Sequence, residues 1–271
     1  MLLFLDIDGT LTEPGSNVVP ESAAEALRRA AENGHRLFLC TGRNRAMLSP
    51  LMKYGFEGAV ASAGGYVFAG EKVLFDCPME RETFTLAMEL FRESGVFRTV
   101  EAKDGAWCDA GMGEFLVSRN GGNSELLRWR RALEEDLGMR PLAEYDGRPV
   151  YKIVFMCAHE KQLEGARQAL EDRYHFVLQD AFSPNCVNGE MIDRHYDKGK
   201  GVRIVAEALG YTPEETVGFG DSMNDLEMIG TVGTSVCMGN GSPLLKAKSD
   251  IVCPPVGQDG LAEAFRMLGL I

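Results

Sequence analysis

The stretch Leu2-Leu3-Phe4-Leu5-Asp6-Ile7-Asp8-Gly9-Thr10-Leu11 decides how this chain is interpreted. Its first four residues form a short apolar run, which predicts a buried strand. Two aspartates then follow at positions i and i+2, although aspartate is depleted within strands. At the carboxyl end of a strand in an open α/β sheet, both would emerge in the crevice where such sheets bind ligands. Taken alone, the same residues also fit a solvated Asp-Gly turn.

A second acidic segment, Gly218-Phe219-Gly220-Asp221-Ser222-Met223-Asn224-Asp225, has the same form. Asp221 directly follows a short apolar run, and Asp225 lies one helical turn further on, so both side chains can face one point. A helix N-cap is the alternative role for Asp221 or Ser222. A dinucleotide-binding loop is rejected, because Met223 stands where that motif requires its third glycine.

If the two strand ends are neighbours, these segments predict a site for a divalent cation. Carboxylates about 4 Å apart repel each other by roughly 4 kcal/mol at an effective dielectric constant of about 20, so the cluster stays ionised only around a cation. A few carboxylates with room for water favour Mg²⁺. Because the same ion would neutralise substrate charge, we expect metal-assisted phosphoryl chemistry. The four carboxylates are those of Asp6, Asp8, Asp221 and Asp225.

Two further segments fit phosphate binding. Thr41-Gly42-Arg43 follows the second apolar run and offers a hydroxyl and backbone N–H groups at the same sheet edge, although, taken alone, this segment fits a plain strand-to-helix turn better. Asp197-Lys198-Gly199-Lys200-Gly201 opens a helix. A lysine there opposes the helix dipole and calls for an anionic partner. The spacing does not choose between Lys198 and Lys200, and either could be solvated.

Both ends of the chain alternate apolar runs with helical periodicity, which predicts an α/β fold with a Rossmann-like, doubly wound parallel sheet. Strands are expected at 2–5, 36–40, 58–62, 217–220 and 232–238. Helices are expected at 21–33, 202–209, 222–229 and 260–268, with a helical segment from Asn44 that Pro50 shortens or kinks.

The middle of the chain has adjacent strands with few helices, which indicates an inserted α+β module. Strands are expected at 97–101, 106–110, 150–155 and 175–178, and helices around 84–91, 126–137 and 163–170, with a break at Gly121-Gly122. We therefore predict a core formed by residues 1–79 and 185–271, interrupted by a module at 80–184.

Composition narrows the class of protein. The 271 residues carry 28 basic and 40 acidic side chains, a formal net charge of −12, which disfavours nucleic-acid binding. The seven cysteines are odd in number and form no Cys-x-x-Cys pair, which favours free thiols in a reducing compartment. Without a basic leader or a stretch of about 18 apolar residues, no signal peptide or membrane helix is expected, and the protein is predicted to be cytoplasmic.

The order of these motifs resembles the haloacid dehalogenase superfamily, and within it the Cof-type phosphatases with a C2B cap. The resemblance extends over nearly the whole chain. It rests on Asp6-x-Asp8-Gly9-Thr10-Leu11, Thr41-Gly42-Arg43, Lys198-Gly199, Gly220-Asp221-x-x-Asn224-Asp225 and the closing Gly257-Gln258-Asp259-Gly260-Leu261. One departure is Ser62-Ala63-Gly64-Gly65, where many relatives have Asn-Gly, so no substrate contact is carried over to Ala63.

The resemblance implies a role for each motif residue. Asp6 would attack phosphorus and become an aspartyl phosphate, and Asp8 would protonate the leaving group and then deprotonate water. Phosphate would be bound by Thr41, Gly42, Lys198 and Asn224. Mg²⁺ would be held by Asp6, the carbonyl of Asp8, Asp221 and Asp225. Asp225 would either bind the ion directly or contact the residues that bind it.

Substrate choice would come from the inserted module, which in this family closes over the pocket as a lid. Arg43 and Lys152 are candidate substrate contacts, and Trp107, Arg119 and His195 are weaker ones. The alternative for each of the module residues is an ordinary surface or core position.

The expected function is that of a Mg²⁺-dependent phosphomonoesterase, a monomer or weak homo-oligomer, acting on a small phosphorylated metabolite such as a sugar phosphate. A phosphomutase of the phosphomannomutase type is one alternative, but those enzymes carry a longer Gly-Gly-Asn-Asp ending on the fourth motif. A non-catalytic phosphate-binding protein is the other, and loss of Asp6 or Asp8 would have indicated it. Both aspartates are present.

Overall fold

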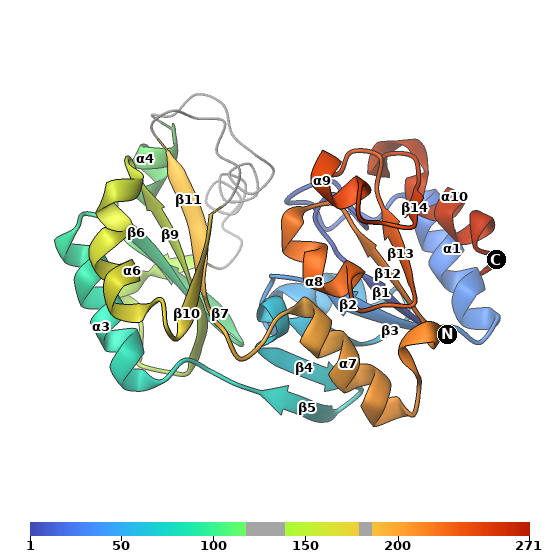
Figure 1. The fold of residues 1–271 in the computed structure, drawn as a ribbon, viewed down its shortest axis with the longest axis horizontal. Coiled ribbons are helices and arrows are strands. Elements are labelled where there is room, and N and C mark those ends of the chain that lie inside the picture. Colours follow the sequence, from blue (N-terminus) through green and yellow to red (C-terminus); the bar gives the residue numbers. More distant parts are fainter. Residues whose placement is uncertain (118–138, 179–185) are drawn as a thin grey trace. The chain divides into compact units, whose positions relative to one another are not determined.

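The computed structural model describes residues 1–117, 139–178 and 186–271 (Figure 1). They form two compact units. The first combines Met1–Asp76 with Tyr196–Ile271, and the second is the insertion Cys77–His195. The predicted helix at 126–137, the break at Gly121-Gly122 and Arg119 lie outside the described residues.

The first unit is built on an eight-stranded sheet of order β14-β13-β12-β1-β2-β3-β4-β5. The strands from β14 to β3 are parallel, whereas β4 and β5 pair antiparallel at one edge as a hairpin that the sequence did not indicate. The strands are β1 (Leu2–Leu5), β2 (Arg36–Cys40), β3 (Phe56–Ala61), β4 (Tyr66–Ala69), β5 (Lys72–Asp76), β12 (Thr216–Gly220), β13 (Thr234–Cys237) and β14 (Ile251–Val252).

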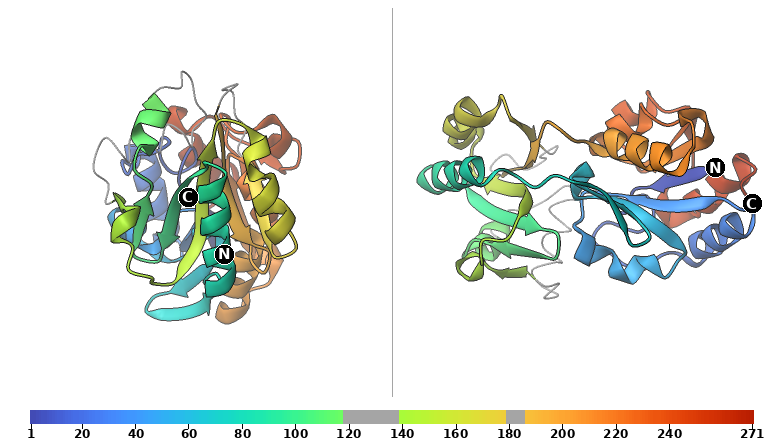
Figure 2. Two further views of the ribbon diagram at one scale, coloured as in Figure 1. Left: turned by 90° about the vertical axis from the view of Figure 1, so that its left-hand side faces the viewer. Right: turned by 90° about the horizontal axis from the view of Figure 1, so that it is seen from below.

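Helices cover both faces of this sheet, so the doubly wound α/β prediction is confirmed (Figures 1 and 2). On one face α7 (Lys198–Leu209) and α8 (Leu226–Ile229) pack on Phe4 and Phe38. On the other, α1 (Glu21–Glu32) packs beside α10 (Gly260–Met267), whose Phe265 ring lies 5.1 Å from that of Phe219. The shorter helical segments are η1 (Arg45–Leu48), α2 (Ser49–Met52), η2 (Ser62–Gly64), η5 (Pro213–Glu215), η6 (Met223–Asp225), α9 (Pro243–Lys246) and η7 (Val256–Gln258).

The second unit contains a six-stranded sheet of order β10-β11-β9-β6-β7-β8, antiparallel except for the β7–β8 pair. Its core joins one sheet face to α3 and α6, with the rings of Phe91 and Phe155 5.8 Å apart. The elements are α3 (Arg81–Glu93), β6 (Phe97–Ala102), β7 (Gly105–Cys108), α4 (Met112–Val117), β8 (Met139–Pro141), η3 (Leu142–Glu144), β9 (Val150–Cys157), η4 (Glu160–Leu163), α6 (Glu164–Leu170), β10 (Tyr174–Leu178) and β11 (Val187–Asp193).

The insertion extends further than the sequence indicated. Strand β11 pairs with both β9 and β10, so the insertion ends at His195 rather than at 184, and it starts at Cys77 rather than at 80. The polar Asn188, Gly189 and Glu190 interrupt the apolar pattern of β11, although all three are buried. A pattern based on hydrophobicity therefore does not reveal this strand.

All seven cysteines lie in the described part of the chain as free thiols. Five of them are buried, namely Cys40, Cys157, Cys186, Cys237 and Cys253. Among the described residues, no helix combines the length and the apolar composition that crossing a lipid bilayer requires.

Candidate active site

The first and fourth motifs meet because β1 and β12 are parallel neighbours. Asp6 extends this pairing, since its N–H donates to the carbonyl of Phe219 at 2.9 Å. Gly9 then turns the chain with φ of +89° and approaches Asp221 so closely that a Cβ would lie 2.3 Å from its Oδ2. Only glycine fits at this position, where it has both the backbone angle and the space it needs.

Lys198 is the centre of the cluster. As the first residue of α7, it is buried, and its Nζ donates to Asp6 Oδ1 at 2.7 Å, Asp225 Oδ1 at 2.6 Å and Asn224 Oδ1 at 3.2 Å. Lys200 instead places its Nζ 5.5 Å from the centre of the Phe75 ring. Of the two lysines that spacing did not distinguish, Lys198 is the one whose ammonium contacts the aspartates.

The carboxylates of Asp221 and Asp225 differ in how many hydrogen-bond donors contact their oxygens. Asp225 Oδ2 accepts hydrogen bonds from the N–H groups of Asp221 and Ser222 at 3.0 and 3.1 Å, so both of its oxygens already have donors. Asp221 Oδ1 is buried without a hydrogen-bond partner. A buried carboxylate oxygen without a partner is unfavourable unless a cation contacts it.

These residues fit a divalent cation. Asp6, Asp221 and Asp225 each offer one oxygen, and the three oxygens lie within 4.8 Å of one another. Against three carboxylates the ammonium of Lys198 supplies one positive charge, so two formal negative charges remain in the buried cluster. An all-oxygen set with this charge is the donor chemistry that Mg²⁺ prefers.

The pKa shifts have the same cause. Burial raises the pKa of Asp6 to about 7, although Lys198 opposes the rise. Burial and the nearby Asp6 carboxylate raise the pKa of Asp221 well above its ordinary value. Burial alone would lower the pKa of Lys198, but Asp225 and Asp6 raise it well above the usual range. The lysine therefore stays charged, and the carboxylates are the groups that need a further cation.

The carboxylate of Asp8 accepts hydrogen bonds from Arg43 and from the backbone of Gly15. Arg43 donates from Nε to Asp8 Oδ2 at 2.9 Å and from Nη2 to Oδ1 at 2.7 Å, and the N–H of Gly15 also donates to Oδ1, at 2.7 Å. The remaining guanidinium contacts are to Asn17 Oδ1 at 2.6 Å and the carbonyl of Ser16 at 3.0 Å. Because Arg43 is buried and bound within the protein, the structure does not present it as the expected substrate contact.

Thr41 follows β2 at the same sheet edge and is buried. Its Oγ1 accepts a hydrogen bond from the N–H of Arg43 at 3.1 Å, while Gly42 between them is half-buried. The loop after β3 supports this turn, because Ala63 N–H donates to the carbonyl of Thr41 and Ser62 N–H to that of Arg43, at 3.0 and 2.9 Å.

The backbone conformation of the loop after β3 was not predicted from the sequence. Ser62 and Ala63 have positive φ angles of 50° and 57°, in the left-handed region that non-glycine residues rarely adopt. The following Gly64 has φ of +107° and lies against the carbonyl of Asp197, the residue before Lys198. The pair Gly64-Gly65 was the only indication of this turn in the sequence.

Lys152 belongs to the second unit and is held there. It is fully buried on β9, where its Nζ lies 2.5 Å from Glu190 Oε1 and 3.5 Å from Glu101 Oε2. Trp107 is also buried, as the core alternative predicted, with its ring against that of Tyr145 and under the guanidinium of Arg148. His195 is exposed, and its Nδ1 lies 2.7 Å from Asp193 Oδ1.

A buried carboxylate cluster with a lysine, at the carboxyl edge of a parallel α/β sheet, is typical of phosphoryl-transfer enzymes. A family model of haloacid dehalogenase-like hydrolases matches residues 3–265, and the chain belongs to this family. The resemblance stated from the motifs is therefore confirmed.

Named relatives agree with this class. The HMP-PP phosphatase of Serratia proteamaculans is 29% identical, over 91% of this chain and 86% of its own. The pyridoxal phosphate phosphatase YbhA of Escherichia coli is 24% identical, over 97% of this chain and 96% of its own. Among solved structures, the phosphatase BT1666 from Bacteroides thetaiotaomicron has the same fold with a TM-score of 0.81 at 21% identity, covering 100% of this chain and 95% of that one. The chain is thus a phosphatase of the haloacid dehalogenase-like family.

Proposed function

We propose that the protein is a Mg²⁺-dependent phosphomonoesterase that hydrolyses a small phosphorylated metabolite through an aspartyl-phosphate intermediate. The observation that carries this proposal is the contact of Lys198 Nζ with Asp6 Oδ1 at 2.7 Å, within the buried cluster that Asp6 forms with two further aspartates. The lysine can hold the oxygens of a phosphoryl group next to the carboxylate that attacks it.

The reaction has two steps on residues of this chain. In the first, a carboxylate oxygen of Asp6 bonds to phosphorus while the bond to the ester oxygen breaks, and Asp8 donates its proton to that leaving oxygen. In the second, the oxygen of a water molecule bonds to phosphorus while the bond from phosphorus to the Asp6 oxygen breaks, and Asp8 takes a proton from that water. Inorganic phosphate leaves and both aspartates return to their starting forms.

Other residues bind the phosphoryl group and the ion. Lys198, the hydroxyl of Thr41 and the N–H of Gly42 would contact phosphate oxygens, with Asn224 orienting the lysine that it already contacts at 3.2 Å. Mg²⁺ would offset the negative charge of the phosphoryl group and of the attacking carboxylate. Asp6, the carbonyl of Asp8 and Asp221 would hold it, and Asp225 completes the acidic cluster while fixing Lys198 and the backbone of the fourth motif.

The substrate class rests on the relatives. The chain is similar to phosphatases named for pyridoxal phosphate and for 5-amino-6-(5-phospho-D-ribitylamino)uracil, and has the fold of a subclass IIB sugar phosphatase, BT4131. We infer a small phosphate monoester of this kind, such as a sugar phosphate, with the inserted unit selecting the leaving group. The free thiols support a reducing, cytoplasmic location, and a monomer or weak homo-oligomer remains our expectation.

A screen for phosphate release tests the function. Purified chain is incubated with sugar, nucleotide and cofactor phosphates, with Mg²⁺ or with EDTA, and inorganic phosphate is measured. We expect release from some monoesters with Mg²⁺, none with EDTA, and a loss of at least about 10³-fold in Asp6→Asn. Asp172→Asn, an exposed aspartate of the insertion, is the matched control and should keep full activity. Near-normal turnover by Asp6→Asn would show that Asp6 is not the nucleophile.

A further inference from the structure

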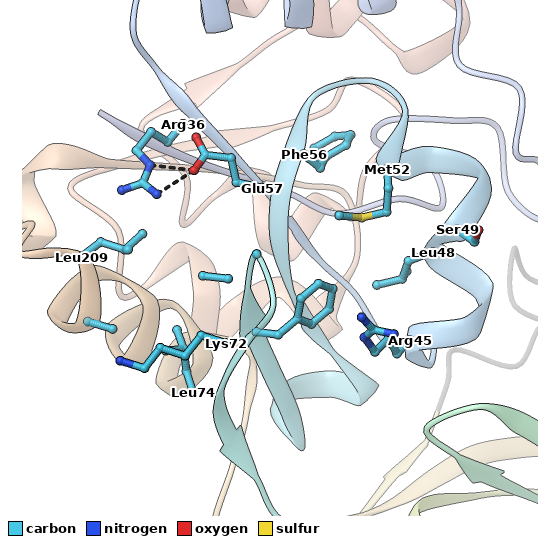
Figure 3. A pocket seen from close by; sticks show the side chains of 14 residues that line it. Arg36, Arg45, Leu48, Ser49, Met52, Phe56, Glu57, Lys72, Leu74 and Leu209 are labelled. Atoms are coloured by element: carbon cyan, nitrogen blue, oxygen red, sulfur yellow. Dashed lines mark hydrogen bonds and ion pairs between the residues drawn. The ribbon is translucent and has the colours of Figure 1, made fainter.

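A cavity of about 660 Å³ opens in the first unit, and none of the residues assigned to the aspartate cluster lines it (Figure 3). Its walls come from the start of β2, from η1 and α2, from β3 and the β4–β5 hairpin, and from the last turn of α7. The volume lies within the range of about 300–1,000 Å³ that is typical of small-molecule sites.

The floor of this cavity is apolar. Leu48, Phe56 and Phe68 are buried beneath it, while Leu74 and Leu209 line it half-buried. Aromatic and aliphatic side chains in this arrangement can cover the apolar body of a ligand and remove it from water.

The rim is positively charged, although the chain as a whole carries −12. Three cations from three different elements, Arg36, Arg45 and Lys72, line the cavity, together with one carboxylate, that of Glu57. Arg36 donates to Glu57 Oε2 from Nε at 2.9 Å and from Nη2 at 2.6 Å, so this carboxylate is already paired (Figure 3). Within the described residues, neither Arg45 nor Lys72 forms an ion pair, which leaves two uncompensated cations.

Arg45 is held in place by the floor. Its guanidinium carbon lies 4.9 Å from the centre of the Phe68 ring, a cation–π contact that keeps a charged group next to apolar surface. A ligand that stacks on the same surface would meet the guanidinium with an acidic group. Neither a neutral apolar molecule nor a purely inorganic anion would use both features.

We propose that this cavity binds a small organic anion, in which an apolar ring or chain packs on Phe68 and Leu74 and an acidic group contacts Arg45 and Lys72. The acidic group is a carboxylate, a sulfonate or a phosphate, since all three accept charge-assisted hydrogen bonds. This site is separate from the proposed phosphatase site and does not depend on it.

Fluorescence of 8-anilinonaphthalene-1-sulfonate, an aromatic sulfonate, is the test of binding. The full chain is titrated with this probe, which is then displaced with 2-naphthoate or with its neutral counterpart, 2-naphthalenemethanol. We expect naphthoate to displace the probe and the alcohol to fail. Arg45→Gln and Lys72→Gln should each weaken naphthoate binding about two- to fivefold. The double variant should bind more weakly than either single variant, without the two effects necessarily multiplying, because both cations would contact the same acidic group.

Two variants are the controls. Lys53→Gln removes a cation that also lies over a ring, 5.2 Å from that of Tyr54, but outside the cavity, and should bind naphthoate as the wild type does. Asp6→Asn should also bind naphthoate with the affinity of the wild type. The binding experiment therefore tests the cavity independently of whether the chain shows phosphatase activity. The proposal is overturned by equal displacement with acid and alcohol, by unchanged binding in both rim variants, or by lost binding in Asp6→Asn.

Discussion

Asp8 is fixed at three points, by two nitrogens of Arg43 and by the N–H of Gly15. A bidentate contact with an arginine restrains both the position and the plane of a carboxylate. We therefore regard Arg43 as a positioning residue for Asp8, a role that its sequence motif did not reveal.

Arg43→Gln should lower kcat for an alkyl phosphate about 10- to 100-fold, because a displacement of about 1 Å in a catalytic group has an effect of that order. KM should change less. With p-nitrophenyl phosphate, whose leaving group needs no proton, the loss should be smaller. Steady-state kinetics on both substrates measures the difference, and exposed Arg29→Gln is the control.

A double-mutant cycle makes the test specific. Asp8→Asn should strongly lower kcat for hydrolysis of the alkyl phosphate. Adding Arg43→Gln to this variant should lower kcat little further, since the arginine acts through the aspartate. If the two losses multiply, Arg43 acts on the substrate or on the fold instead of on Asp8.

Motifs located Asp6, Asp8, Asp221 and Asp225 in the sequence because these residues directly follow short apolar strands or lie one helical turn on. The direction of each side chain was not predictable, because it depends on neighbours distant in the chain. Lys198 and Lys200 show this, since they are two residues apart and only one reaches the aspartates. The pairing of Arg43 with Asp8 also joins two motifs that spacing alone does not relate.

The loop after β3 stores backbone strain beside the candidate site. Ala63 has φ of 57° and ψ of 24°, and a left-handed non-glycine residue costs about 1–2 kcal/mol. Ala63→Gly should raise the free energy of unfolding by roughly 0.5 to 1 kcal/mol, because the relief exceeds the entropy that glycine adds to the unfolded chain. Urea unfolding measures this, and Ala24→Gly in α1 should instead destabilise by about 1 kcal/mol. A loss of stability in Ala63→Gly would contradict the strain.

The end of β11 is stabilised by a buried carboxylate. Asp193 Oδ1 accepts from the N–H and Nδ1 of His195 at 2.8 and 2.7 Å, and Oδ2 from Arg173 Nε at 2.9 Å. Burial favours the protonated acid, but these hydrogen bonds prevail and lower the pKa of Asp193. The carboxylate therefore stabilises the fold above its unfolded pKa of about 3.9, and this contribution is lost as the pH falls through the lower folded value.

Asp193→Asn should consequently destabilise the second unit by about 1–3 kcal/mol at neutral pH, and the difference from the wild type should shrink below about pH 4. Both tryptophans of the chain lie within residues 77–195, so tryptophan fluorescence during urea unfolding monitors this unit. A difference that is the same at pH 7 and pH 3 would show that the charge of Asp193 is not the cause.

Elements were predictable where the sequence repeats one kind of residue. The strands β1 and β2 are unbroken or nearly unbroken apolar runs, and their predicted bounds are those of the structure. Among the missed strands, besides the β4–β5 hairpin, β8 and β14 have only three and two residues, and β11 contains Asn188, Gly189 and Glu190. Their strand geometry is imposed by pairing with neighbours rather than by their own pattern.

The chain divides into two units, and in its described part their hydrophobic clusters share no residue: Phe4 and Phe38 belong to a cluster of the first unit, and Phe91 and Phe155 to one of the second. The insertion enters after β5 and returns before α7, so it interrupts the first unit without supplying a strand to its sheet. Cores that share no residues allow the two units to unfold at different denaturant concentrations.

The buried thiols allow the unfolding of the two units to be measured separately, with no added label. Burial raises the pKa of Cys157 and Cys253 to about 11 and that of Cys237 to about 12, so these groups are both inaccessible and protonated at pH 8. Ellman's reagent should react first with half-buried Cys77 and Cys108, and with the others only during unfolding. Mass spectrometry of the modified peptides should then give one rate for Cys40, Cys237 and Cys253 and another for Cys157 and Cys186; a single rate would mean that both cores open together. The reactivity of the native cysteines thus reports which of the two units unfolds first.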